Sequence, residues 1–188
     1  MIKKIIIVFA FFFALSTVKA QDASVEKSIF GAQIGILGIW GHNEARLSNS
    51  IALRSEIGVE IGFYSSSSLV KGSGAFAVPS ITIEPRWYYN LNKRISKSKR
   101  IDGNSGNFIS IKTNYHPDLL LTSINSNYNF ISDLTIIPTW GIRRNIGKHF
   151  NYETAIGIGY IKYFEEENTF LDEADVGVNL HLRIGYRF

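Results

Sequence analysis

The sequence contains no cysteine, only four prolines and a single methionine among its 188 residues. Without cysteine the chain cannot have a disulfide framework, a thiolate metal site, a cysteine nucleophile or a lipid-modified cysteine. Apolar residues, by contrast, make up 45% of the chain and aromatic residues 13%. That content excludes a disordered or collagen-like protein, and the length fits one domain.

Long apolar runs are also missing, except at the N-terminus. A cationic start with Lys3 and Lys4 precedes eleven uninterrupted apolar residues, 5–15, and small residues then lead to Ala20. The run is too short to cross a bilayer as a helix, and the pattern is typical of a secretory signal peptide. We therefore expect a signal peptide over residues 1–20, cleaved after Ala20, and one mature domain over residues 21–188. A membrane anchor is the alternative.

The chain has no strong excess of charge of one sign. It has 20 Lys and Arg against 16 Asp and Glu, and removal of residues 1–20 with their three lysines leaves 17 cations against 16 anions. The mature domain would then be almost neutral. A nucleic-acid partner is therefore not predicted.

After residue 21 no helical stripe of useful length occurs, whereas polar and apolar residues alternate repeatedly. The clearest segments are 47–64, 80–91, 150–160 and 176–188, and weaker ones are 29–40, 107–115 and 134–144. They run about 10–18 residues, longer than the usual 5–6 of soluble strands and long enough for the 9–11 that cross a bilayer. Backbone groups left unpaired in lipid cost several kcal/mol, so a membrane sheet must close on itself. We predict an all-β protein with an antiparallel up-and-down transmembrane β-barrel. A secreted β-sandwich is the alternative.

The last strand ends on an aromatic residue. One of its faces carries Leu180, Leu182, Ile184, Tyr186 and Phe188. This strand resembles the C-terminal sorting strand of the small outer-membrane β-barrel proteins of Gram-negative bacteria, of the OmpX and OmpA kind. The resemblance implies eight strands, a periplasmic C-terminus, location in the outer membrane among its lipids, and recognition of this strand by the barrel-assembly machinery. It also implies roles that range from membrane integrity to adhesion.

With the C-terminus at the periplasm, each connection falls on one side of the membrane. Residues 65–78, 122–130 and 164–175 are predicted as outer loops, and residues 41–46, 91–106 and 146–149 as periplasmic connections. Only seven segments show the alternation expected of a strand, whereas a chain that begins and ends in the periplasm needs an even number of strands. The eighth strand is expected near residues 21–28 or within 65–78.

Aromatic residues on the predicted lipid face form two groups. Near the periplasmic boundary lie Trp87, Tyr89, Trp140, Phe150, Tyr152, Tyr186 and Phe188, and near the outer one lie Phe63, Tyr115 and Tyr160. Two such belts are expected where Trp and Tyr prefer the two membrane interfaces.

The inward face of the predicted barrel carries many charges of both signs. They are Arg54, Glu56, Glu60, Glu84, Arg86, Lys112, Arg143, Glu153, His181, Arg183 and Arg187. An eight-stranded barrel is just wide enough for its interior to be filled by side chains. Buried charges must pair to offset their desolvation, so we predict a network that plugs the lumen. A narrow ion or small-solute channel is the alternative.

No catalytic, cofactor-binding or metal-binding residues are predicted. The histidines His42, His116, His149 and His181 are too far apart in sequence for a zinc motif, and the acidic loop 164–175 lacks a calcium-binding pattern. No Ser-His-acid constellation is evident. We therefore expect no enzymatic activity and a structural or surface-interaction role, with a rim-active lipid-modifying enzyme as a further alternative. The basic stretch from Lys93 to Arg100 is interpreted as a solvated connection or as a contact for anionic lipid heads or cell-wall polymers.

Overall fold

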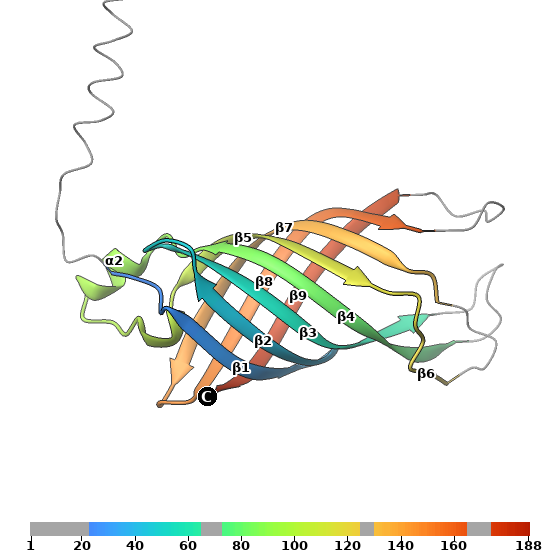
Figure 1. Cartoon of the computed structure of the whole chain (residues 1–188), viewed down its shortest axis with the longest axis horizontal. Coiled ribbons are helices and arrows are strands. Elements are labelled where there is room, and N and C mark those ends of the chain that lie inside the picture. The colour runs from blue at the N-terminus through green and yellow to red at the C-terminus, as the bar shows by residue number, and fades with distance from the viewer. Residues whose placement is uncertain (1–22, 65–72, 125–129, 165–173) are drawn as a thin grey trace, which may run out of the picture.

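The computed structural model describes residues 23–64, 73–124, 130–164 and 174–188. Eight long antiparallel strands form one sheet, with a ninth segment of two residues. The strands are β1 (Ser28–Gly35), β2 (Gly38–Arg46), β3 (Ile51–Tyr64), β4 (Gly74–Trp87), β5 (Asn107–His116), β6 (Thr122–Ser123), β7 (Asp133–Ile146), β8 (Phe150–Tyr163) and β9 (Ala174–Arg187). The order runs β3-β2-β1-β9-β8-β7-β5-β4, and pairing of β3 with β4 closes the sheet into a barrel (Figure 1).

Burial alternates along the strands as the sequence predicts. The buried positions of β4 and β7 are mostly polar, and the exposed positions between them are mostly apolar. Exposed isoleucine, leucine, valine and aromatic side chains cover the outer wall, whereas arginine and glutamate are among the most buried side chains. This inverted distribution is the one a lipid-facing barrel requires. The all-β fold with eight transmembrane strands is therefore confirmed.

The eighth strand lies where the sequence analysis did not place it. Residues 29–46, interpreted as one strand followed by a turn, belong to the hairpin β1–β2, which turns at Ile36 and Leu37. Residues 23–27 form no strand and 74–78 belong to β4, whereas 65–72 lie outside the described residues; the turn expected at 41–46 lies at residues 47–50. Two apolar residues occupy the hairpin tip, so no polar turn signal marked it. Gly38 follows with a φ of 152°, and a Cβ there would lie 2.1 Å from the Val59 carbonyl oxygen.

The two ends of the barrel differ. At one end lie the start of β1, the C-terminus, the turns at 47–50 and 147–149, and a connection with two short helices (Figure 1). These helices are α2 (Leu91–Ile95) and η1 (Asp102–Asn104). The connections after β3, β5 and β8 lie at the other end. We call these the capped end and the loop end. No helix in the described segments is long and apolar enough to cross a membrane.

The connection between β4 and β5 folds across the barrel mouth and forms the cap. A cluster of apolar side chains underlies it, made up of Ala23, Val25, Ala52, Tyr88, Leu91, Phe108 and Ala155, with Ile95 and Ile101 packed against it. Polar contacts fix its edge: Arg187 pairs with Asp102 at 3.0 Å and with Glu26 at 2.9 Å. The stretch 93–100 is mostly exposed, in line with the interpretation as a solvated connection, whereas Leu91, Ile95 and Ile101 on either side and within it pack against the barrel mouth. The lysines of this stretch are exposed to solvent.

Candidate functional site: a charged plug and the cleft above it

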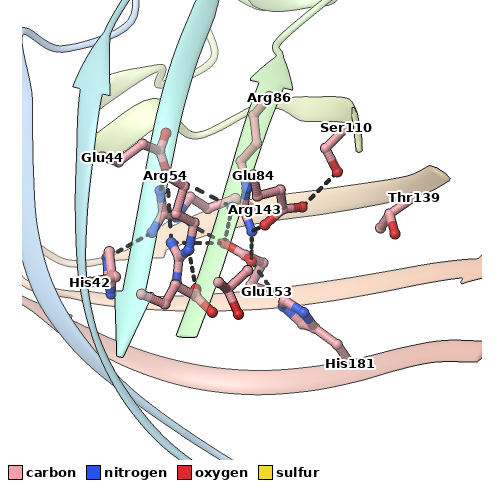
Figure 2. Close-up of polar contacts among 12 residues, drawn as sticks. His42, Glu44, Arg54, Glu84, Arg86, Ser110, Thr139, Arg143, Glu153 and His181 are labelled. Carbon is pink, nitrogen blue, oxygen red and sulfur yellow. Dashed lines mark hydrogen bonds and ion pairs between the residues drawn. The ribbon is translucent and has the colours of Figure 1, made fainter. Parts of the chain in front are cut away.

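Three arginines meet in the middle of the lumen, where alternation on β3, β4 and β7 turns them inward (Figure 2). Arg54, Arg86 and Arg143 are almost completely buried. Arg86 holds both carboxylate oxygens of Glu153 from β8, at 3.0 and 2.8 Å. Arg143 donates to Glu44 of β2 at 2.8 Å, and its Nε lies 3.2 Å from Glu153. Two carboxylates therefore lie among three guanidinium groups.

Further ion pairs and hydrogen bonds connect this central group of charged side chains to residues nearer the barrel wall. Arg183 of β9 donates to Glu56 at 2.9 Å, and Glu56 also accepts from Arg54. Glu84 accepts from Arg86 at 2.7 Å and from the Ser110 hydroxyl at 2.6 Å. His181 lies 2.9 Å from Glu153. We call Glu44, Arg54, Glu56, Glu84, Arg86, Arg143, Glu153 and Arg183 the plug; it has four cations and four anions and is neutral as a unit.

Aromatic rings close the plug on both sides. The Arg86 guanidinium lies 4.2 Å from the Phe108 ring centre, and Phe108 belongs to the apolar cluster under the cap. On the other side the Arg183 guanidinium lies 3.6 Å from the ring of Trp40. Stacking on aromatic rings suits the weakly hydrated guanidinium and keeps water from the ion pairs. The cap, the apolar cluster and the plug together fill the capped half of the barrel.

The loop half holds a second polar group around His116. Its Nδ1 lies 3.0 Å from Asp133 and its Nε2 lies 3.2 Å from Glu60. Glu60 also accepts a hydrogen bond from the Trp40 indole at 3.0 Å. His116 is the last residue of β5 and stands on the inward face of that strand, largely buried. A histidine between two carboxylates is a fixed structural group rather than a free base.

A cleft of about 680 Å³ lies beside this group, above the plug. Its lining includes the inward side chains Trp40, Glu60, Lys112, Asn114, His116 and His181, and Ile36, Leu37, Leu180 and Leu182 at one side. The volume is within the range of small-molecule binding sites. Among the residues that the structure describes, the loop half of the lumen therefore contains a cleft, in contrast to the capped half.

The predicted lumenal residues divide among three places. Arg54, Glu56, Glu84, Arg86, Arg143, Glu153 and Arg183 meet in the plug with His181 at its edge, Glu60 and Lys112 line the cleft, and Arg187 lies apart at the cap. Sequence reasoning missed Glu44 and His42 because residues 41–46 were interpreted as a turn, and it missed Trp40 because residues 29–40 were interpreted as a single strand. Continuing the alternation of β1 across a two-residue hairpin would have placed all three inward.

The C-terminal strand lies as the sequence suggests. Leu180, Leu182, Ile184, Tyr186 and Phe188 are exposed on the outer wall, and Phe188 contacts Tyr186 with ring centres 5.5 Å apart. The two aromatic groups also stand on the outer wall, and Trp140 donates a hydrogen bond to Tyr89 near the capped end. No group of three metal-ligating side chains that could hold an ion occurs in the segments that the structure describes.

The structure combines three features: a closed eight-stranded barrel, an apolar outer wall and a charged interior. The architecture is that of the small outer-membrane β-barrels. No protein-family model and no curated protein matches the sequence. Among solved structures, a match is Ail, the attachment invasion locus protein of Yersinia pestis, in complex with the heparin analogue sucrose octasulfate. The match covers 86% of this chain and 96% of Ail, with 15% identity and a TM-score of 0.35, so the likeness is remote.

Proposed function

We propose that this protein is a non-conducting barrel of a Gram-negative outer membrane that acts through the surface at its loop end. In this proposal residues 1–20 direct export, cleavage follows Ala20, and the capped end faces the periplasm. The surrounding partners are outer-membrane lipids, and the assembly machinery recognises the C-terminal strand.

The sealed capped half of the lumen is the observation that carries the proposal. A solute path would have to cross the apolar cluster around Tyr88 and Phe108 and then the plug. Opening the plug would separate buried ion pairs such as Arg86–Glu153, and an uncompensated buried charge costs about 3–5 kcal/mol. A permanently open channel is therefore disfavoured, and the surface at the loop end remains as the place for interactions.

Planar-bilayer recording tests the sealed lumen. Purified barrel, checked as folded, is expected to give no steady conductance steps in concentrated KCl, at protein amounts where a porin control gives many. Reproducible steps of constant size that are absent from protein-free bilayers would show that the plug conducts and would overturn the proposal.

A rim-active lipid enzyme is the other alternative. Such an enzyme needs a nucleophile activated by a neighbouring base. His116 is a candidate base, but Glu60, Asn114 and Asp133 occupy its ring nitrogens. None of these contacts is a hydroxyl group. Mass analysis of lipid A from cells with and without the protein is expected to show no difference; a changed acyl or phosphate pattern would support an enzyme instead.

Epitope insertion tests the orientation. A tag between Ser67 and Ser68, in the connection after β3, is expected to bind antibody on intact cells. A tag between Ser98 and Lys99, in the cap, should bind only after the outer membrane is permeabilised. The reverse result would place the capped end outside.

A further inference from the structure

Within the segments that the structure describes, the barrel wall is incomplete on one side of the loop half. The hairpin β1–β2 ends at the level where Gly35 pairs with Arg183 and Gly38 pairs with Glu60. Its neighbours continue further, with β3 reaching Tyr64 and β9 starting at Ala174. Beyond the hairpin, residues 174–182 of β9 have no partner strand on that side within the described segments. We call this opening between β3 and β9 the lateral gap.

The lateral gap lies at membrane depth. Around it the outer wall is apolar: Ile36 is 76% exposed, Leu180 is 73% exposed, and Leu182 is exposed beside them. Phe63 and Tyr160, aromatic residues of the outer group, lie further toward the loop end than Gly38 and Arg183. Strand edges in a bilayer are tolerated only where they line a cavity or are covered. The medium outside this edge is acyl chains.

The cleft behind the lateral gap contains a cation that makes no direct contact with an anion. Lys112 lines the cleft and is only 7% exposed. It makes no hydrogen bond or ion pair within the described segments, and its charge acts at longer range on Glu56 and Glu60. The acidic residue in the lining, Glu60, is already bound by Trp40 and His116. Because no carboxylate lies at ion-pair distance from the Lys112 ammonium, a ligand carboxylate that enters the cleft can form the direct charge-assisted contact that the chain does not supply.

We propose that the cleft binds a single-chain anionic amphiphile, such as a long-chain fatty acid, that enters from the bilayer through the lateral gap. Its carboxylate pairs with Lys112 in a charge-assisted hydrogen bond. Its chain passes between Leu37 and Leu180 and remains among the acyl chains outside. The plug below the cleft stops the ligand from crossing to the capped end, so this is a binding site and not a path. The proposal does not depend on the absence of conductance.

Quenching of tryptophan fluorescence by brominated palmitic acid tests the site. The chain has three tryptophans, and Trp87→Phe with Trp140→Phe leaves Trp40, in the cleft, as the single reporter. In micelles we expect saturable quenching of Trp40 by the acid, and at least a tenfold higher half-saturation concentration for its methyl ester. This comparison uses one folded protein. Equal binding of acid and ester, or quenching that never saturates, would overturn the proposal.

Variants test the role of Lys112 and the route. Lys112→Met should raise the half-saturation concentration at least tenfold, whereas Lys162→Met, on the outer wall of β8, should not change it. With all three native tryptophans replaced by Phe, Leu180→Trp beside the lateral gap should show saturable quenching, and Ile111→Trp on the far wall, in the same background, should not. A Lys112→Met protein with the same half-saturation concentration as the parent would overturn the proposal. Equal quenching of the tryptophans introduced at positions 180 and 111 would overturn it as well.

The same titration separates other occupants. Inorganic phosphate or acetate that displaces the acid at millimolar concentrations would indicate a site for small soluble anions and would contradict the amphiphile. Saturable quenching by brominated phosphatidylglycerol but not by the acid would assign the cleft to two-chain lipids and would likewise contradict it.

Discussion

Glu44 connects three parts of the molecule through one carboxylate. It accepts hydrogen bonds from the Tyr88 hydroxyl at 2.9 Å, from the Asn104 side chain at 2.6 Å and from Arg143 at 2.8 Å. Asn104 belongs to the cap and Arg143 to the plug. A completely buried carboxylate is stable only with such a full set of donors. Glu44 therefore couples closure of the mouth to the charged layer.

Removal of this carboxylate should be severe. Glu44→Ala is expected to lower the free energy of unfolding by about 3–5 kcal/mol, because Arg143 loses its closest anion while it stays buried. Equilibrium unfolding in urea with detergent or lipid measures the change. Asp118→Asn, an exposed acid at the loop end, should change it by less than about 0.5 kcal/mol. Equal effects of the two substitutions would contradict the role assigned to Glu44.

Gly58 lets Trp40 lie flat against the lumen wall. A Cβ at Gly58 would stand 2.4 Å from both the Ile39 carbonyl oxygen and the Trp40 ring. Gly58→Ala should therefore displace the indole from Arg183 and Glu60 at a cost of about 1–3 kcal/mol. The Trp40 emission should shift to the red as the ring becomes more exposed.

Gly41 provides the matched control for this prediction. It lies on neighbouring β2, where the nearest atom to an added Cβ is 3.9 Å away. Gly41→Ala should leave the emission and the stability almost unchanged. A Gly58→Ala protein with the emission of the parent would show that the wall yields instead of the indole.

At the scale of elements, alternation predicts six of the eight long strands and their inward faces. It fails at β1 and β2, because the parity of the inward positions shifts across Ile36 and Leu37, and neither residue is a usual turn former. It also misses the cap, whose fold depends on distant contacts such as Arg187 with Asp102. Local pattern specifies a strand, whereas tertiary contacts decide how an irregular connection folds.

The prolines of β4 and β7 are a second example of a structural detail that the local sequence pattern does not specify. Pro85 and Pro138 each stand where paired positions are interrupted, between Ile83 and Arg86 and between Ile136 and Thr139. Across each interruption the two facing strands contain equal numbers of residues, so neither strand has the extra residue that defines a β-bulge. Proline has no amide hydrogen to donate, and this alone interrupts the hydrogen bonds between the strands.

The cap should loosen in acid. Arg100, by its hydrogen bonds, holds the pKa of the Asp102 carboxyl below its ordinary value, and Asn145 and Arg187 act in the same direction. A carboxyl group with a lowered pKa in the fold stabilises it above its unfolded pKa, and this contribution is lost as the pH falls through the folded value. We expect amide exchange at Gly103 and Ser105 to increase on acidification below about pH 4.

Asp102→Asn tests the origin of this change. Its cap should exchange faster at neutral pH, and the exchange should depend less on pH in the acidic range after correction for intrinsic rates. Asp118→Asn should retain the response of the parent. A response in Asp102→Asn identical to that of the parent would assign the acid sensitivity to another group.

At the scale of the whole molecule, the described residues fill one half of the barrel and leave a cleft in the other. Ion pairs and an apolar cluster fill the capped half, whereas the loop half has a cleft and an interrupted wall. In lipid, a continuous hydrogen-bonded wall is the main source of stability against unravelling, because it leaves no edge. The short β1–β2 hairpin still completes that wall over the capped half, where β9 pairs with β1 and β2 with β3.

Closure of the barrel predicts a mobility shift in gels. Unboiled protein in dodecyl sulfate should stay folded and migrate differently from the boiled form, because the closed wall offers detergent no free strand edge in the capped half. Samples heated stepwise should convert in one transition, since removal of any long strand opens the wall. Glu44→Ala should convert at a lower temperature and Asp118→Asn at that of the parent. A single band at one position before and after boiling would contradict a closed barrel, whatever the state of the plug.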